Sequence, residues 1–211
     1  MALRHLERLT ERYPQLEECR EDILAAYGKL RNVYERKGML LVCGNGGSGA
    51  DSEHIVGELM KEFALRRPLG DGEQERLRDA FGGHGELLAA NLQGSLPAIA
   101  LTGNTALSTA IANDAAPELV FAQQVYGYGT AESALLGIST SGNSLNVIYA
   151  LEVARSKGMA VIGLTGGAGG RMRELCDVCI CVPAQETADI QELHLPVYHT
   201  LCRMIEEAFF G

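Results

Sequence analysis

Four polar side chains on two expected helices are suited to proton transfer or to metal binding. His54 and Glu58 are four residues apart, so on a helix they lie on one face, one turn apart. The C-terminal stretch adds Gln191 and His199, separated by about 12 Å along an otherwise apolar helix. Two imidazoles, a carboxylate and an amide suit zinc or another divalent cation, and they also suit an acid/base pair. The helical spacing leaves both possibilities open.

The stretch before His54 is expected to let a ligand approach the backbone. An apolar strand is expected at 39–43 and a helix at about 52–63, with Ser48 or Asp51 as the cap of that helix. The residues between them are small, and an anionic group would fit there. They include four glycines, Gly44, Gly46, Gly47 and Gly49.

Two nucleotide-binding motifs are rejected for this loop. Its glycines satisfy G-x-G-x-x-G, but the next expected strand, 97–101, ends in Thr102-Gly103 and not in the acid that binds a ribose. The stretch 66–96 also separates the two strands too far for a compact βαβ unit. A Walker loop fails because no Gly-Lys-Ser/Thr sequence follows the glycines.

A hydroxyl-rich run at 139–144 is typical of a phosphate cradle at the start of a helix. Gly142 would let backbone N–H groups converge there without a lysine. Helix capping alone would need one hydroxyl, whereas this run offers four, on Ser139, Thr140, Ser141 and Ser144.

Alternation of apolar strands with helices predicts an α/β fold with a parallel sheet covered by helices. In such sheets, ligands bind outside the carboxyl ends of the strands. The loops expected at that edge are 44–51, 102–105, 139–144 and 165–170. The five expected strands are 39–43, 97–101, 134–139, 159–165 and 178–182. The expected helices after the first strand are 52–63, 105–112, 117–126, one from the 139–144 loop to about 157, and 187–210, the last capped by Thr187 or Asp189.

Two segments stand outside this alternation within an expected single domain, 1–211. The N-terminal segment 1–37 is helical in pattern with a break at Pro14, and it is expected either to cover the sheet or to pack against another subunit. The insertion-like excursion 66–96 has two possible helices interrupted by glycines. Such a long connection is usually a lid, an oligomer contact or a mobile excursion.

The composition excludes several classes of protein. The net charge of -9 argues against non-specific binding of nucleic acid. The charged N-terminus and the lack of a long apolar stretch argue against secretion and a membrane span, so a cytoplasmic location is expected. Cys176, Cys179 and Cys181 cluster in sequence, but their alternation with apolar residues favours a buried strand over a zinc site.

These motifs, in this order, resemble the sugar isomerase (SIS) domain of phosphoheptose isomerases. The resemblance covers nearly the whole chain. It rests on Gly44-Asn45-Gly46-Gly47-Ser48 with His54 and Glu58, then Asn113-Asp114, the run from Ser139 to Ser144, and the stretch from Gln191 to His199.

The resemblance implies a flavodoxin-like sheet of five parallel strands and a homotetramer with active sites at subunit interfaces. The implied reaction converts sedoheptulose 7-phosphate to D-glycero-D-manno-heptose 7-phosphate through an enediol. That is the first step toward ADP- or GDP-heptose and lipopolysaccharide-type glycans. No organic cofactor is implied.

The resemblance also implies roles for individual residues. The acid/base pair would be Glu58 and His199, and zinc would be held by His54, Glu58, Gln191 and His199, so Glu58 is expected as base, ligand or both. The substrate would be bound by Asn45, Gly46, Gly47, Asn113, Asp114, Ser139, Thr140, Ser141, Ser144 and Gln191.

Two other functions are compatible with this sequence. Relatives in the superfamily act as non-catalytic partners of the bacterial replication initiator, a role that does not require the set on His54, Glu58 and His199. Another phosphosugar isomerase or lyase is also possible. The excursion 66–96 is longer than expected for the family, and it could reshape the sugar end of the pocket.

Overall fold

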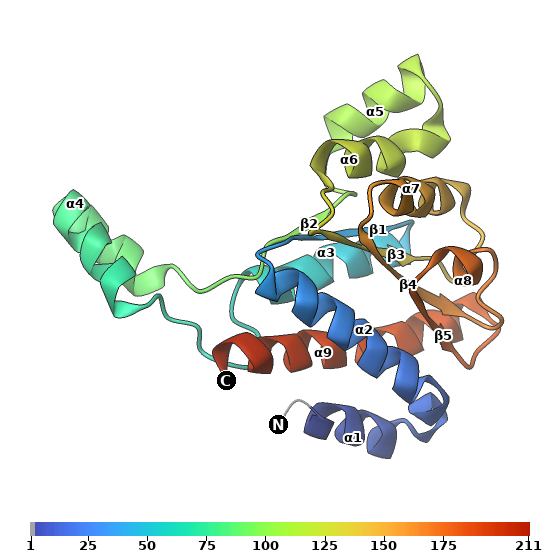
Figure 1. The fold of residues 1–211 in the computed structure, drawn as a ribbon, viewed down its shortest axis with the longest axis horizontal. Helices are drawn as coiled ribbons and strands as arrows, with labels where there is room; N and C mark the ends of the chain where they lie inside the picture. The colour runs from blue at the N-terminus through green and yellow to red at the C-terminus, as the bar shows by residue number, and fades with distance from the viewer. Residues whose placement is uncertain (1–2) are drawn as a thin grey trace.

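Five parallel strands form a sheet at the centre of the computed structural model, which describes residues 3–211 (Figure 1). The strand order β2-β1-β3-β4-β5 is the flavodoxin-like order that was expected. Every residue of β1 and β3, in the interior of the sheet, is buried. The strands are β1 (Leu40–Gly44), β2 (Ala98–Ala100), β3 (Ala134–Ile138), β4 (Ala160–Gly166) and β5 (Val178–Val182).

Helices cover both faces of the sheet. Leu40, Leu136 and Ile180 face one helical layer, while Leu41 and Leu135 face the other. Because side chains alternate along a strand, burial on both faces explains why the strands are continuous apolar runs. The first layer contains α1 (Leu3–Arg12), the 3-10 helix η1 (Pro14–Cys19), α2 (Arg20–Glu35), α3 (Gly47–Met60) and α9 (Thr187–Phe210). The second contains α6 (Val120–Tyr128), α7 (Leu145–Ser156) and α8 (Met172–Leu175), with α5 (Thr105–Asp114) and η2 (Pro117–Leu119) leading into α6.

The N-terminal helical segment packs against the core. The break expected at Pro14 is confirmed, since α1 ends at Arg12 and the short helix η1 begins at Pro14. Leu6 and Leu16 are fully buried and belong to the first core layer. The segment therefore helps to cover the sheet, which was one of its two expected roles. Met1 and Ala2 lie outside the described residues.

The excursion 66–96 contains one interrupted helix, α4 (Asp71–Asn91), which projects away from the sheet (Figure 1). Gly82 has a φ of 53°, which breaks the helix at the expected glycines. The two halves fold back on each other, and Arg78 Nε donates to Glu86 Oε2 at 3.1 Å. Phe81 and Leu87 remain more than half exposed. Within one chain α4 points away from the sheet, and the idea that the excursion 66–96 reshapes the sugar end of the pocket stays a prediction.

One helix start and the caps of two helices differ from the predictions, whereas the predicted start of the terminal helix at Thr187 is confirmed. Helix α3 begins at Gly47 and not at residue 52, and its N-cap is Gly46, so the capping roles given to Ser48 and Asp51 are wrong. The φ of 53° and ψ of -120° at Gly46 form a sharp turn that only glycine adopts readily. Helix α9 begins at Thr187 with Glu186 as N-cap and no side-chain cap bond, so Thr187 and Asp189 are not its caps.

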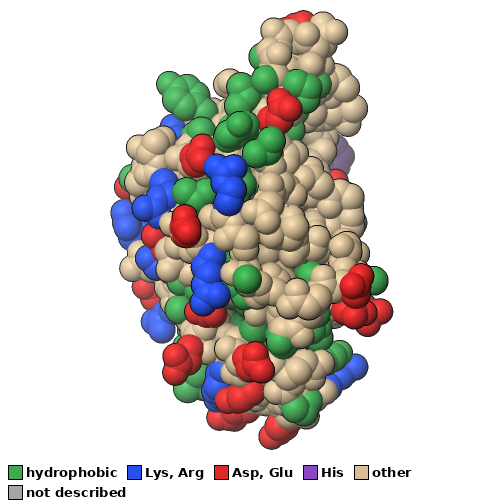
Figure 2. Space-filling view, turned by 90° about the vertical axis from the view of Figure 1, so that its right-hand side faces the viewer, with side chains coloured by type: hydrophobic (Ala, Val, Ile, Leu, Met, Phe, Trp, Pro, Cys, Tyr) green, Lys and Arg blue, Asp and Glu red, His purple; other side chains and the backbone are tan. Residues whose placement is uncertain are grey.

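The surface shown in Figure 2 carries acidic and basic side chains interspersed, without a continuous basic stripe on that face. This pattern agrees with the acidic composition. Among residues 3–211, no helix has the length and apolar character needed to span a bilayer.

Candidate active site

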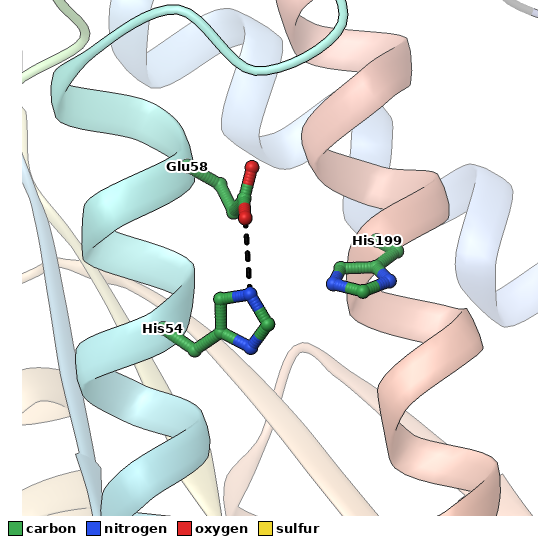
Figure 3. A group of neighbouring side chains, drawn as sticks. All are labelled: His54, Glu58 and His199. Carbon is green, nitrogen blue, oxygen red and sulfur yellow. Dashed lines mark hydrogen bonds and ion pairs between the residues drawn. The ribbon is translucent and has the colours of Figure 1, made fainter.

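Helices α3 and α9 bring His54, Glu58 and His199 together (Figure 3). His54 and Glu58 project from successive turns of α3, with His54 Nε2 and Glu58 Oε1 3.0 Å apart. His199 points toward them from α9, and its ring centroid is 5.0 Å from that of His54. One potential ligand atom from each of the three residues lies within 4.8 Å of the others. The sequence predicted this grouping, but the distance across the two helices required the structure.

Tyr198 and Asp51 orient the ring of His54. The hydroxyl of Tyr198 donates to Asp51 Oδ1 at 3.1 Å and lies 3.1 Å from His54 Nδ1. Since its one hydrogen is committed to Asp51, the hydroxyl accepts from His54 Nδ1–H. In a neutral imidazole, Nε2 then carries a lone pair that faces the Glu58 carboxylate. That contact is favourable only if a proton or a cation lies between the two groups.

Two buried atoms of Glu58 and His199 lack a hydrogen-bond partner in residues 3–211. Glu58 Oε2 and His199 Nε2 are buried and make no hydrogen bond within the described part of the chain. Burial, together with the charges of His54 and Arg203, lowers the pKa of His199. A buried carboxylate oxygen and a neutral imidazole nitrogen without partners fit a divalent cation, which prefers such ligands. His54, Glu58 and His199 would hold it.

Gln191 lies beside the glycine loop at the start of α3. It precedes His199 by roughly two helical turns, about 12 Å along α9. A Cβ atom on Gly47 would be 2.5 Å from Gln191 Nε2, so only glycine lets the amide come this close to the start of α3. The structure thus places Gln191 beside Gly47, and its expected role as a metal ligand stays a prediction.

The glycine loop borders an open groove of about 500 Å³ at the carboxyl ends of β1 and β2. Asn45 contributes to this groove, and its side-chain amide exchanges two hydrogen bonds of 2.9 Å with the amide of Asn146. A Cβ on Gly44 would be 2.6 Å from the carbonyl oxygen of Ser48, which explains the glycine. The edge of the sheet where ligands were expected therefore contains a groove. Asn146 was not predicted from the sequence, because it lies beyond the hydroxyl-rich run.

The hydroxyl-rich loop between β3 and α7 is held in a tight turn. Ser139 Oγ and Ser144 Oγ are 2.9 Å apart, and Asn143 N donates to Ser141 Oγ at 3.2 Å. Gly142 has a φ of 66°, and a Cβ there would overlap the carbonyl oxygen of Gly169 in the next loop. Asn143 was not among the predicted site residues. Its Oδ1 accepts a hydrogen bond from Arg171 N at 3.0 Å, which connects the two loops.

Asn113 and Asp114 do not join the groups described above. They lie at the end of α5, where Asn113 Nδ2 donates to Asp114 Oδ1 at 2.7 Å and both side chains are exposed. Figure 1 shows α5 on the opposite side of the sheet from α9, which carries His199. Within one chain, these two residues and the group at His199 are separate.

Cysteines and His194 take no part in this site. Cys179 and Cys181 lie half-buried on β5 as free thiols, and burial raises the pKa of Cys181 to about 12. His194 is fully buried, and burial lowers its pKa to about 4, so its ring is neutral. In the range 3–211, His54, Glu58 and His199 are the set of His, Cys, Asp or Glu side chains close enough to share a metal ion.

Comparisons with known proteins agree on one family. The SIS domain profile matches residues 78–166. The phosphoheptose isomerase of Aneurinibacillus thermoaerophilus is 41% identical over 182 residues, which cover 86% of this chain and 79% of that protein. The phosphoheptose isomerase of Rhodospirillum rubrum is 38% identical, covering 92% of this chain and 89% of the relative. The chain belongs to the phosphoheptose isomerase family.

Solved structures of the family support the assignment. Phosphoheptose isomerase from Neisseria gonorrhoeae superimposes with a TM-score of 0.73 at 33% identity, covering 95% of this chain and 96% of the other. The enzyme from Francisella tularensis gives a TM-score of 0.71 at 31% identity, with coverages of 98% and 92%. The five-stranded sheet and the helical layers described above are thus those of a phosphoheptose isomerase.

Proposed function

We propose that the protein converts sedoheptulose 7-phosphate to D-glycero-D-manno-heptose 7-phosphate through an enediol. The observation that carries this proposal is the grouping of His54, Glu58 and His199 within 4.8 Å in a member of the phosphoheptose isomerase family. A ketose and an aldose interconvert by moving a proton between C1 and C2, which requires a base and a group that polarises the carbonyl oxygen. This site offers both.

Glu58 is the base in this proposal. Its carboxylate takes a proton from C1 of the ketose and returns a proton to C2 of the enediol. The imidazole of His199 gives its ring proton to the carbonyl oxygen at C2 as the enediol forms, and it takes the proton of the C1 hydroxyl as the aldehyde forms. The proposal is supported by the position of Glu58 Oε2, which is buried and has no partner in residues 3–211.

Zinc is the proposed metal, with His54, Glu58, His199 and, as a further candidate, Gln191 as ligands. The unpartnered atoms of Glu58 and His199 support this assignment. When bound, a divalent cation would supply a Lewis acid for the carbonyl oxygen. The hydrogen-bonded pair of Tyr198 and Asp51 would orient His54 toward it.

The phosphate group is proposed to bind at the hydroxyl-rich loop. The convergence of Ser139, Ser141 and Ser144 at the start of α7 supports an anion site, and a phosphate held there would fix the sugar relative to Glu58. The other proposed substrate contacts are Asn45, Gly46, Gly47, Thr140 and Gln191.

The biological unit is proposed to be a homotetramer of single-domain chains, 1–211, in the cytoplasm. In this assembly Asn113 and Asp114 would serve the site of a neighbouring subunit, because within one chain they lie apart from His199. The product would enter ADP- or GDP-heptose synthesis for lipopolysaccharide-type glycans. A non-catalytic partner of the replication initiator would not need His54, Glu58 and His199 together, so that alternative is disfavoured.

The test is an assay of the purified protein with sedoheptulose 7-phosphate in deuterated water, with and without a chelator. We expect aldose carrying deuterium at C2, and loss of turnover with the chelator. Glu58→Gln should lower kcat by about 10²- to 10⁴-fold, whereas Glu62→Gln, just beyond the end of α3, should not. The absence of aldose with this substrate, together with turnover of another sugar phosphate, would refute the assigned substrate.

A further inference from the structure

A second pocket, of about 220 Å³, lies between α1 and α9. It shares His199 with the candidate active site, but its other lining residues, from α1, Tyr13 and α9, take no part in that site. Arg8 and Arg12 line it from α1, and Arg203 lines it from α9. His5 completes the basic lining, and no aspartate or glutamate is part of it.

The three arginines have no acidic partner. Within residues 3–211, no carboxylate oxygen lies within 4.0 Å of the guanidinium groups of Arg8, Arg12 or Arg203. Their neighbour Arg4, in contrast, is 2.6 Å from Glu207. The chain has 27 acidic and 18 basic residues, so acidic partners are abundant. Three guanidinium groups that lack a carboxylate partner in residues 3–211 therefore line one cavity.

Arg203 is the most enclosed of the three. Its guanidinium lies over the ring of Phe63, 5.2 Å from the centroid, which fixes its plane. Its Nε is buried and has no hydrogen-bond partner in the described part of the chain. The Arg203 side chain is therefore held against Phe63 where it lines the pocket, and its positive charge is available to an anion there.

We propose that this pocket binds phosphate or a phosphate monoester. Arg8 and Arg12 are four residues apart, so both project from one face of α1, opposite Arg203 on α9. Guanidinium groups converging from two walls provide the forked donors that bind phosphate oxygens in pairs. The site is separate from the hydroxyl-rich loop at 139–144, whose residues do not line it. Its occupation does not depend on the proposed isomerase activity.

The test is a calorimetric titration of the full-length protein with inorganic phosphate and with pyrophosphate. The Ser141→Ala variant serves as the background, so that binding at the hydroxyl-rich loop is weakened. In that background, adding Arg8→Gln and Arg12→Gln should raise the Kd for the phosphate that still binds at least about tenfold. Arg31→Gln, on α2 and paired with Glu35 at 2.8 Å, is the matched control and should leave the Kd unchanged.

Two results would overturn the proposal. One is an equal phosphate affinity with and without the α1 arginines. The other combines two observations. The protein that keeps both arginines binds no phosphate, and the Arg8→Gln, Arg12→Gln variant has a different molecular mass by light scattering. That second result would assign these arginines to a contact between copies of the chain. Turnover enters neither measurement, so the outcome is independent of the substrate assignment.

Discussion

Arg67 and Glu206 form an ion pair removed from solvent, with Arg67 Nε 2.8 Å from Glu206 Oε1 and side-chain exposures of 0% and 1%. Arg67 also donates to the carbonyl oxygens of Glu58, at 3.0 Å, and Leu59, at 2.8 Å. Glu206 accepts from the backbone N–H groups that follow α3, at Phe63 and Ala64. The pair therefore anchors the end of α3, which carries Glu58, to α9, which carries His199.

Loss of the charge at Glu206 should strongly destabilise the fold. Glu206→Gln leaves the buried Arg67 cation uncompensated, and we expect the free energy of unfolding to fall by about 3–5 kcal/mol. Urea denaturation at fixed protein concentration measures this. Glu35→Gln breaks the exposed pair with Arg31 and should change the same quantity by at most about 0.5 kcal/mol. Similar losses in the two variants would contradict the structural role of the buried pair.

Zinc affinity should depend on His54 and His199. Replacing either one by alanine removes a proposed ligand, so zinc bound after dialysis, measured by mass spectrometry, should drop well below that of the unchanged protein. Tyr198→Phe removes the hydroxyl that orients His54 and should weaken binding by about 10- to 100-fold. His84→Ala, an exposed histidine on α4, is the control. Zinc retention by both ligand variants would rule out this site.

The hydroxyl of Ser141 should affect the binding of a phosphorylated substrate. Removing one hydrogen bond to a charged group costs about 1.5–3 kcal/mol, so Ser141→Ala should raise the KM roughly 10- to 100-fold and change kcat much less. Steady-state kinetics with the sugar phosphate measures both. Ser156→Ala, at the exposed end of α7, should leave them unchanged. An unaltered KM in Ser141→Ala would move the phosphate away from this loop.

His194 should make the fold less stable in mild acid. Its pKa is lowered by burial from 6.5 to about 4 in the folded protein, so the unfolded chain binds more protons between these values. Stability that is fully present above pH 6.5 is lost as the pH falls, by about 2 kcal/mol between pH 7 and pH 5.

Urea denaturation at both pH values checks this expectation. His194→Gln should lose that part of the pH dependence, while His84→Gln should keep it, because His84 is exposed. An identical pH dependence in the two variants would show that His194 does not titrate as described.

The sequence by itself determined the architecture and most of the local chemistry. Apolar runs such as the one at β1 identified the five parallel strands, because a strand buried on both faces has no room for polar side chains. The spacing of His54 and Glu58 placed both on one face of a helix, since helical periodicity is local. The hydroxyl-rich loop could be singled out because its hydroxyls lie within six residues of one another, and its role in phosphate binding stays a prediction.

Only the tertiary structure decided which distant residues meet. His199 faces His54 because α9 packs beside α3, and Gln191 instead reaches Gly47 two turns earlier. Arg67 with Glu206, and Tyr198 with Asp51, are pairs that are far apart in sequence, so no local pattern reveals them. The start of α3 was also misplaced, because the turn at Gly46 replaces the side-chain cap that local rules expect. Contacts of this kind depend on how the helices pack, and helix packing is set by the whole core.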